Sequence, residues 1–225
     1  MQLALYTMSA FVHFKLREHD LLLTDARSIY WEEQKVLIVS DLHLGKAGHF
    51  RKAGIGIPQT IFKEDLQRLV AQLQYFKPEH LLVVGDLFHS TDNKEHELFL
   101  KWRKDLKGFS IQLVKGNHDI LSEEWYKKAD ISVHISEFVI SDLIFTHDPL
   151  TVEQKGSAYY ICGHIHPGIL LTGVGMRSVR LPCFYFGKTQ AILPAFGKFT
   201  GTQTIKPVKG DSVFAVMEGK IVKIQ

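Results

Sequence analysis

Five short polar clusters in this 225-residue chain contain the side chain types that bind divalent metal ions. They are Asp41-Leu42-His43, Gly85-Asp86, Gly116-Asn117-His118-Asp119, His147-Asp148 and Gly163-His164-Ile165-His166. Asp, Asn and neutral His supply oxygen and nitrogen ligands for borderline divalent ions. In D-x-H and H-x-H the two ligands lie two positions apart, so an extended backbone points both in one direction. The residue types therefore indicate a metal centre.

The number of ligands indicates two ions rather than one. Residues of ligand type are Asp41, His43, Asp86, Asn117, His147, His164 and His166. Two ions roughly 3.5–4 Å apart, bridged by a carboxylate, would use all of them. Asp86 is the expected bridge, because it stands alone after its predicted strand.

Each cluster taken alone has an ordinary structural explanation. Asp-x-His or Gly-Asp after a strand is usually a turn or a cap, and Gly-Asn-His-Asp is compatible with a tight turn of positive φ. All five clusters in this order, each after a predicted buried strand, favour the metal centre. They also account for several of the 12 histidines, an unusual number for this composition.

The strands and helices that must position these clusters follow from apolar patterning. Continuous apolar runs predict buried strands over 36–39, 81–84 and 111–114. Apolar residues at helical spacing predict helices over 58–76 and 95–106, with a short helix over 123–129 capped by Ser122. Short antiparallel strands are expected within 11–33. From residue 131 strands dominate: 131–135, 138–140, 143–146, 159–162, 169–171, 179–186, 190–193, 213–217 and 221–224.

This order of elements predicts an α/β fold with two packed sheets flanked by helices, because a β-α-β-α-β half precedes a β-rich half. No repeat, low-complexity tract or linker interrupts the chain, so we expect one domain over residues 1–225. The ends of strands in a central sheet share one edge, where α/β proteins place their sites. Clusters spread over residues 41–166 are therefore expected to meet there.

The series D-x-H, G-D, G-N-H-[DE], H and G-H-x-H over residues 41–166 resembles the calcineurin-like metallophosphoesterase superfamily. The resemblance implies a four-layer αββα sandwich of two mixed sheets. It also implies hydrolysis of phosphoesters at a two-metal centre, by in-line attack of a metal-bound hydroxide. It assigns one ion to Asp41, His43, Asp86 and His166. It assigns the second to Asp86, Asn117, His147 and His164. His118 and Asn117 would lie at the substrate phosphate, with His118 and Asp86 as catalytic residues.

Several neighbouring residues have expected supporting roles. His118 is not needed as a ligand, so it is free to protonate the leaving alkoxide. His89 is expected to orient His118, or else it begins a surface loop. Asp119 and Asp148 would orient imidazoles, or are turn residues. Cys162 is expected to be a buried small apolar residue and not a nucleophile.

A second resemblance narrows the family. Asp41 to Lys46, Phe50-Arg51, Arg180 to Phe184 and Leu193 to Gly201 are similar to the ligase-associated DNA damage response group called PdeM. That likeness implies a phosphodiesterase or endonuclease acting on DNA, single-stranded or damaged, with DNA ligase and helicase as partners. Gly85 to His89 resembles nucleases of the SbcD type, whereas lipid-A-pathway hydrolases tend to have Glu at the position of His89. The alternatives are a nucleotide, cyclic-nucleotide or nucleotide-lipid phosphoesterase, and a non-catalytic scaffold.

Two segments carry candidate DNA contacts. Lys46 and Arg51 lie on a glycine-containing loop and would contact phosphate oxygens. Segment 184–199 interleaves aromatic residues with Lys188 and Lys198, a pattern that suits single-stranded nucleic acid. Lys46 and Arg51 could instead lie on a solvated loop. At least half of the aromatic residues in segment 184–199 are expected to be core residues of strands.

Composition and charge set the outer limits. With 45% hydrophobic and 23% charged residues, the chain is globular rather than disordered, collagenous or coiled-coil. Its net charge is +3, and residues 177–225 hold eight Lys or Arg against two Asp or Glu. Two cysteines without C-x-x-C, no signal-peptide pattern and no long apolar run predict a cytoplasmic protein without a membrane span. We expect Mn²⁺ as the metal, with Zn²⁺ or Fe²⁺ as alternatives.

Overall fold

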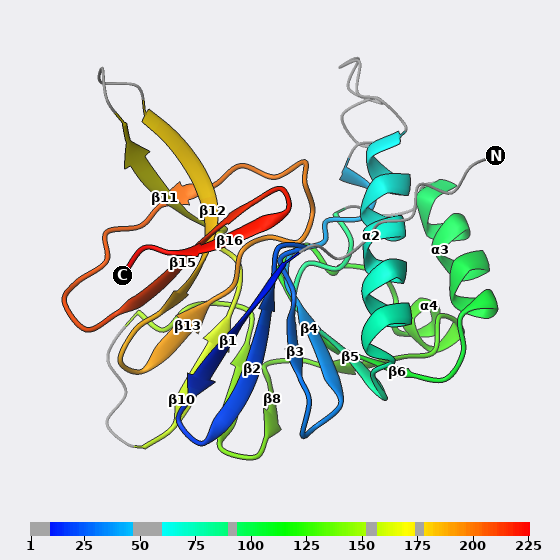
Figure 1. Cartoon of the computed structure of the whole chain (residues 1–225). Helices are drawn as coiled ribbons and strands as arrows, with labels where there is room; N and C mark the ends of the chain where they lie inside the picture. Colours follow the sequence, from blue (N-terminus) through cyan, green and yellow to red (C-terminus); the bar gives the residue numbers. More distant parts are fainter. Residues whose placement is uncertain (1–9, 47–59, 90–93, 152–156, 174–177) are drawn as a thin grey trace.

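The computed structural model describes residues 10–46, 60–89, 94–151, 157–173 and 178–225. In these residues two mixed β-sheets pack face to face, and helices cover the outer face of one sheet (Figure 1). The predicted α/β arrangement of two mixed sheets with flanking helices is thereby confirmed. The assignment of residues 1–225 to a single domain stays a prediction.

The first sheet has seven strands in the order β1-β2-β3-β4-β5-β6-β7. They are β1 (Phe11–Leu16), β2 (His19–Thr24), β3 (Ile29–Trp31), β4 (Val36–Val39), β5 (His80–Val84), β6 (Ser110–Val114) and β7 (Ile131–His134). The first three strands and β4 pair antiparallel, whereas β4, β5, β6 and β7 are parallel neighbours. The carboxyl ends of β4, β5 and β6 therefore lie at one edge.

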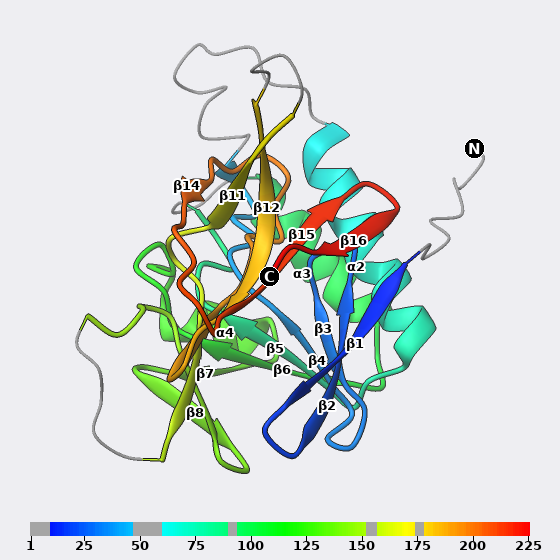
Figure 2. The same ribbon diagram turned by 60° about the vertical axis from the view of Figure 1, so that its left-hand side comes forward.

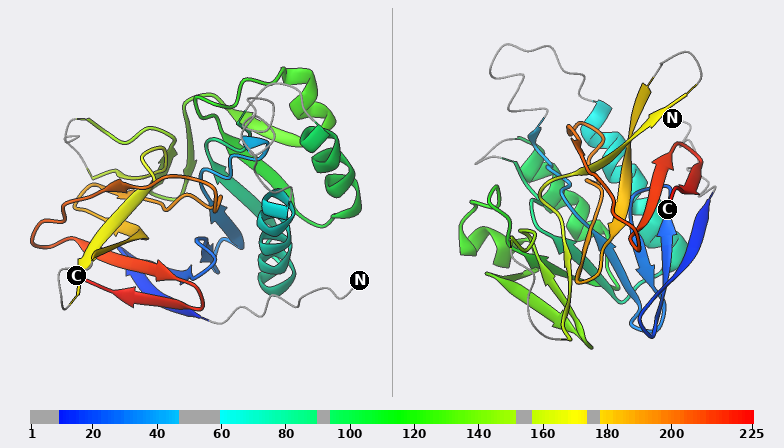
Figure 3. Two further views of the ribbon diagram at one scale, coloured as in Figure 1. Left: turned by 90° about the horizontal axis from the view of Figure 1, so that it is seen from above. Right: turned by 90° about the vertical axis from the view of Figure 1, so that its left-hand side faces the viewer.

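In the described residues, three helices connect the parallel strands and lie on the same face of this sheet (Figure 3). They are α2 (Thr60–Phe76), α3 (Lys94–Asp105) and α4 (Glu123–Lys128), the last capped by the Ser122 side chain as predicted. Strand β5 shows why its apolar run is continuous. Leu81 and Val83 pack in the cluster under the helices, while Leu82 and Val84 pack in the cluster between the sheets. Alternate residues of a strand point to opposite faces, so a strand buried on both faces is apolar throughout.

The second sheet has nine strands and forms the other layer (Figure 2). Its main path is β14-β11-β12-β13-β10-β9-β8, and β15 pairs with β12 and β16. The strands are β8 (Glu137–Ile140), β9 (Leu143–Thr146), β10 (Tyr159–Cys162), β11 (Pro167–Thr172), β12 (Ser178–Phe186), β13 (Gln190–Ile192), β14 (Gln203–Thr204), β15 (Ser212–Met217) and β16 (Lys220–Lys223). Strands β9, β10 and β13 are parallel, which gives this sheet a carboxyl edge of its own. Among these strands, the short β14 is the one that was not predicted from the sequence.

Candidate metal centre

The predicted ligands come together where the carboxyl ends of parallel strands from both sheets meet. Asp41, Asp86 and Asn117 follow β4, β5 and β6 of the seven-stranded sheet. His147 follows β9 of the nine-stranded sheet, and the G-H-x-H segment follows β10. Two sheet edges rather than one therefore supply the site. The convergence of all five clusters depends on how the sheets pack.

One group of donor atoms consists of Asp41, His43 and His166, whose ligand atoms lie within 4.8 Å of one another. The Nε2 atoms of His43 and His166 are 3.1 Å apart. The Nε2 atom of His166 is 3.3 Å from Oδ1 of Asp41. The Nε2 atom of His43 is 3.7 Å from Oδ2 of Asp86. Ring nitrogens and carboxylate oxygens that converge in this way suit a divalent cation between them.

A second group forms around His147. Its Nε2 atom lies 3.5 Å from Oδ2 of Asp86, 3.2 Å from Oδ1 of Asn117 and 3.2 Å from Nδ1 of His164. The same Asp86 oxygen therefore faces His43 on one side and His147 on the other. This is the placement expected of a carboxylate shared by two ions.

Backbone carbonyls fix which ring nitrogen of two histidines faces the centre. The Nδ1 atom of His147 lies 3.3 Å from the oxygen of Val84, and Nδ1 of His166 lies 3.2 Å from the oxygen of Gly201. When Nδ1–H donates to a carbonyl, Nε2 keeps its lone pair for a metal ion. Both Nε2 atoms do face the donor groups described above.

Burial and charge set the protonation of the core of the site. Burial lowers the pKa of His43 to about 2, so this ring is neutral and able to bind a metal. Burial also disfavours the charged form of His147, but the hydrogen bond and charge of Asp86 outweigh it and raise the pKa of His147 to about 9. Conversely, burial opposes ionisation of Asp86, and His147 outweighs this and lowers the pKa of Asp86 to about 2. Asp86 is therefore an anion at neutral pH.

Backbone conformation marks the same residues. Positive φ angles occur at Asp41 (51°), His43 (48°), Asp86 (51°), His164 (68°) and His166 (48°). A residue with a side chain in this region costs of order 1–3 kcal/mol, and the surrounding structure must hold it there. Five of the eleven non-glycine residues with positive φ in the described chain thus belong to the donor groups, which supports a functional site there.

Two glycines allow the sheets to approach each other at the site. A Cβ atom at Gly85 would lie 1.8 Å from Nδ1 of His147, and Gly85 has a φ of +78°. A Cβ atom at Gly163 would lie 1.9 Å from Oγ of Ser40 and 2.4 Å from Oδ2 of Asp41. Any side chain at either position would push a donor residue away. The glycines of the motifs are therefore needed for contact between strand ends.

His118 and His89 lie beside the first donor group. The backbone N–H of His118 donates to Oδ1 of Asp86 at 2.9 Å, and its ring centroid lies 5.3 Å from that of His43. The His89 ring stacks on the His118 ring at 4.5 Å, and Nδ1 of His89 is 3.4 Å from Nδ1 of His43. His89 thus contacts both the candidate acid and a candidate ligand, whereas the sequence suggested only the former.

The two additional aspartates differ. Asp119 is buried and accepts hydrogen bonds from the backbone amides of Phe88 and Gly116, at 3.1 and 2.9 Å. Burial raises the pKa of Asp119 to about 7. These bonds join the loops after β5 and β6, which supports a role as a loop residue. Asp148 is largely exposed, and its Oδ1 lies 3.4 Å from Nδ1 of His164, next to the second donor group.

The predicted substrate contacts are placed only in part. Lys46 is half-buried near the donors: burial lowers its pKa, against the opposing charges of Asp86 and Asp41. Arg51 lies outside the described residues. In segment 184–199, Phe184, Phe186 and Phe196 are buried core residues and cannot stack on bases, whereas Phe199 is partly exposed. Cys162 is buried, as expected, and burial raises the pKa of its thiol.

Sequence reasoning missed two contributors to the site. The hydroxyl of Ser40 donates to Oδ2 of Asp41 and lies 3.0 Å from the oxygen of Val84, so it links β4 and β5 at the donors. The loop 195–201 hydrogen-bonds the backbone beside Asp41 and the ring of His166. Ser40 at the end of an apolar run was a visible signal. The loop gave no signal of contact, because it contributes backbone atoms to these bonds and its partners are distant in sequence.

Comparisons with known proteins identify the family of the chain. The family model of the calcineurin-like phosphoesterases matches residues 34–184. The crystal structure of the nuclease MPE from Pseudomonas putida is similar, with a TM-score of 0.81 and 28% identity over 96% of this chain and 100% of that one. No curated protein sequence matches the chain. In the described part of the chain no helix is long and apolar enough to cross a membrane. The chain therefore belongs to the calcineurin-like phosphoesterase family and is a metal-dependent phosphoesterase.

Proposed function

We propose that this phosphoesterase is a two-metal phosphodiesterase that cleaves DNA internally during DNA repair. The observation that carries the two-metal part is the position of Asp86, whose Oδ2 lies between the ring nitrogens of His43 and His147. The likeness to a nuclease structure supports a nucleic-acid substrate. The resemblance to the PdeM group supports DNA repair, with a DNA ligase and a helicase as partners.

The donor groups fit the two ions that the family implies. Asp41, His43, Asp86 and His166 are the proposed ligands of one ion. Asp86, Asn117, His147 and His164 are the proposed ligands of the other. The mixture of nitrogen and oxygen donors suits Mn²⁺, the proposed metal, and Zn²⁺ and Fe²⁺ are the alternatives to test. When bound, the ions would supply Lewis acidity at the phosphoryl group and acidify water there.

His118 is the proposed general acid for the leaving oxygen. Its backbone amide is fixed by Asp86, and its ring packs against His43 and His89. An imidazole held beside the donors without being needed as a ligand is able to protonate a leaving alkoxide. Stacking on His89 restricts the ring to one orientation, which is the proposed contribution of His89.

Lys46 and Asn117 are the proposed contacts to non-bridging phosphate oxygens. Oδ1 of Asn117 lies 3.2 Å from Nε2 of His147. Lys46 is half-buried, and the charges of Asp86 and Asp41 favour its protonated form. A cation at this position offsets the charge of a phosphodiester. A role for Arg51 in the same contact stays a prediction.

A cytoplasmic location is part of the proposal. Cys162 and Cys183 are both buried and free. Free buried thiols are typical of proteins that work in a reducing compartment.

A cleavage assay tests the proposal. The purified chain, treated with chelator and then supplied with Mn²⁺, Zn²⁺ or Fe²⁺, is given circular single-stranded, duplex and gapped DNA beside nucleotides and bis-p-nitrophenyl phosphate. We expect Mn²⁺-dependent hydrolysis of bis-p-nitrophenyl phosphate and linearisation of the circular single strand, which only an endonuclease produces. His80→Ala serves as a control histidine variant that should keep full activity. His80 lies at the amino end of β5, away from the donors, and its ring hydrogen-bonds the Ser110 hydroxyl at 2.8 Å.

The outcomes separate the alternatives. Hydrolysis of nucleotides without cleavage of any DNA would replace the nuclease by a nucleotide phosphoesterase. No hydrolysis of any substrate with any of the three metals would favour the non-catalytic scaffold.

A further inference from the structure

The loop 195–201, between β13 and β14, contacts two of the proposed ligands of one ion. The backbone N–H of Phe196 donates to the oxygen of Ser40 at 2.7 Å, and that of Gly197 donates to the oxygen of Asp41 at 3.1 Å. The oxygen of Gly201 accepts from Nδ1 of His166 at 3.2 Å. The loop therefore fixes the backbone at Asp41 and the ring orientation of His166.

A buried arginine on α2 holds this loop. Arg68 is 4% exposed, and its Nη2 donates to the oxygen of Phe196. Its guanidinium lies 4.2 Å from the centroid of the Phe196 ring. The same Nη2 is 3.0 Å from Oδ1 of Asp65, and the Asp65 carboxylate accepts the backbone N–H of Lys198 at 3.3 Å. The Arg68–Asp65 pair thus holds Phe196 and Lys198, on either side of Gly197.

A second arginine, Arg27, also holds the loop. Arg27, in the turn between β2 and β3, donates from Nη1 to the oxygens of Ala195 and Gly197, at 3.1 and 3.3 Å. The loop has no spare room to shift toward the donors. A Cβ atom at Gly197 would lie only 2.5 Å from the oxygen of Leu42. Movement of the loop would therefore be passed directly to the backbone beside Asp41.

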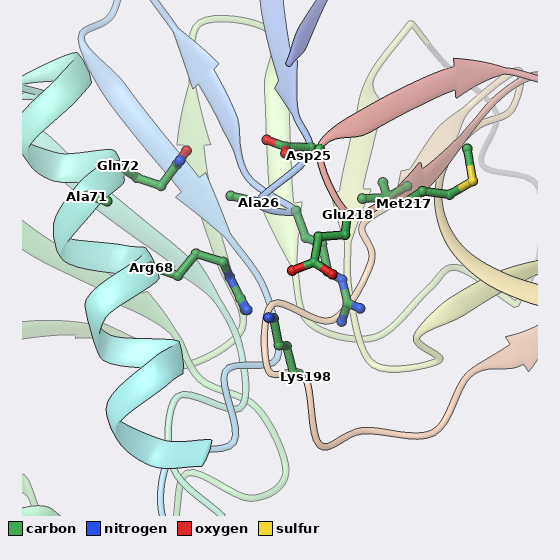
Figure 4. A pocket seen from close by; sticks show the side chains of 11 residues that line it. Asp25, Ala26, Arg68, Ala71, Gln72, Lys198, Met217 and Glu218 are labelled. Atoms are coloured by element: carbon green, nitrogen blue, oxygen red, sulfur yellow. The ribbon is translucent and has the colours of Figure 1, made fainter. Parts of the chain in front are cut away.

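A cavity of about 220 Å³ borders this arrangement (Figure 4). Arg68 from α2, Lys198 from the loop and Glu218 from the turn between β15 and β16 point into it. Shortening Arg68 would enlarge an existing cavity rather than open one in a close-packed core. The variant loses the ion pair to the buried Asp65 and is expected to be less stable, but Asp65 keeps its bond from the backbone N–H of Lys198 and no cavity opens in the close-packed core, so we expect it to fold.

We infer that Arg68, Asp65 and Arg27 are positioning residues that act through the loop 195–201 to build the site of one ion, the one assigned to Asp41, His43, Asp86 and His166. The inference rests on the proposed ligand assignment. It follows from the chain of contacts, because two ligands of this ion touch the loop. His147 and Asn117, ligands of the other ion, are held by β5 and by each other. The two ions should therefore differ in their dependence on Arg68.

Titration of the full chain with Mn²⁺ alone tests the inference, by calorimetry and by electron paramagnetic resonance of the coupled ions. The wild type is expected to bind two ions. In Arg68→Met we expect the affinity for one ion to fall at least tenfold, with loss of the spin-coupled signal, while the other ion keeps its affinity.

The matched control is Arg103→Met. Arg103 is also a buried arginine that pairs with an aspartate, Asp130 at 2.6 Å, and donates to the backbone oxygens of Leu106 and Phe109. It lies at the end of α3 and contacts no residue of the loop. We expect Arg103→Met to lose thermal stability and to bind both ions as the wild type does.

Two unchanged ions in Arg68→Met, or equal loss of metal in Arg68→Met and Arg103→Met, would overturn the inference. If Arg68→Met does not fold, Arg27→Met is read by the same criteria, since it removes two loop bonds and leaves Arg68 paired with Asp65. Failure of the wild type to bind two ions would instead reject the proposed two-metal function.

Discussion

Replacement of Gly85 by alanine tests whether contact between the strand ends builds the metal centre. Gly85 precedes Asp86, the proposed shared carboxylate, and has a φ of +78°. The added Cβ would lie 1.8 Å from Nδ1 of His147, whereas ordinary contact begins near 3.4 Å. The ring must therefore move by about 1.6 Å. Such a shift breaks the Nδ1 contact to Val84 and takes Nε2 away from Asp86 and Asn117.

The expected loss has two separable parts. Alanine at positive φ costs about 1–2 kcal/mol of folding free energy, which lowers the Tm of a chain of this size by a few degrees. Misplacement of a reacting group or its ligand by about 1 Å costs on the order of 100-fold in rate, equivalent to about 2.7 kcal/mol of transition-state stabilisation. We therefore expect kcat for bis-p-nitrophenyl phosphate to fall about 100-fold in Gly85→Ala.

Gly108→Ala separates the two parts. Gly108 has a φ of +95°, and nothing lies within 4 Å of its added Cβ. It precedes β6 at the edge opposite the donors, so this variant carries the backbone cost alone. We expect a similar fall in Tm with unchanged Mn²⁺-dependent hydrolysis. If Gly85→Ala keeps more than half of the wild-type kcat while its Tm falls as in Gly108→Ala, the reasoning about strand-end contact is refuted.

Three further predictions concern the same centre. Asp86→Asn should remove Mn²⁺ binding at both sites and all activity. His118→Ala should lower kcat by 100-fold or more and leave both ions bound. Calorimetry and hydrolysis rates test both, and metal retained in Asp86→Asn or metal lost in His118→Ala would contradict the assigned roles. Because Asp86 raises the pKa of His147, a proton occupies that ring below this pKa and must leave when a metal binds. Mn²⁺ affinity should therefore rise from pH 6 to pH 9, with proton release detected in buffers of different ionisation enthalpy, and a flat profile would contradict the proposed ligand. Chelation should abolish hydrolysis and lower Tm, and Mn²⁺ at about 100 times its Kd should restore about 2.7 kcal/mol of stability; an unchanged Tm would argue against binding to the folded chain.

Local sequence patterns predicted the helices and strands well, because a strand that is buried on both faces has a continuous apolar run. The apolar run 81–84 is buried on both faces, and it appears as most of β5. Ser122 caps α4 as expected, because a serine hydroxyl before a helical stretch binds an exposed backbone amide. The two-residue strand β14 was missed, since it pairs with β11 through only two positions and has exposed side chains.

The aromatic segment 184–199 shows what local pattern leaves open: core packing, expected for at least half of its aromatic residues, holds for Phe184, Phe186 and Phe196. Phe184 and Phe186 pack between the sheets, and Phe196 packs under the helices beside Arg68. Sequence alone does not distinguish a base-stacking aromatic from a core aromatic, because the same side chains serve both roles. Exposure decides between them, and exposure is a property of the folded chain.

The sequence by itself determined the chemistry of the site: the donor types, their order, and their place after buried strands, which follow from side-chain chemistry and apolar periodicity. Only the tertiary structure decided that donors from two separate sheets meet around Asp86. The distance between donors of the two sheets depends on packing between the sheets, through residues such as Leu82, Val84 and Phe145. It also depends on Gly85 and Gly163, which leave room for the neighbouring donors. The tertiary structure also decided that Arg68 and the loop 195–201 support one half of the site, because their contacts join residues more than a hundred positions apart.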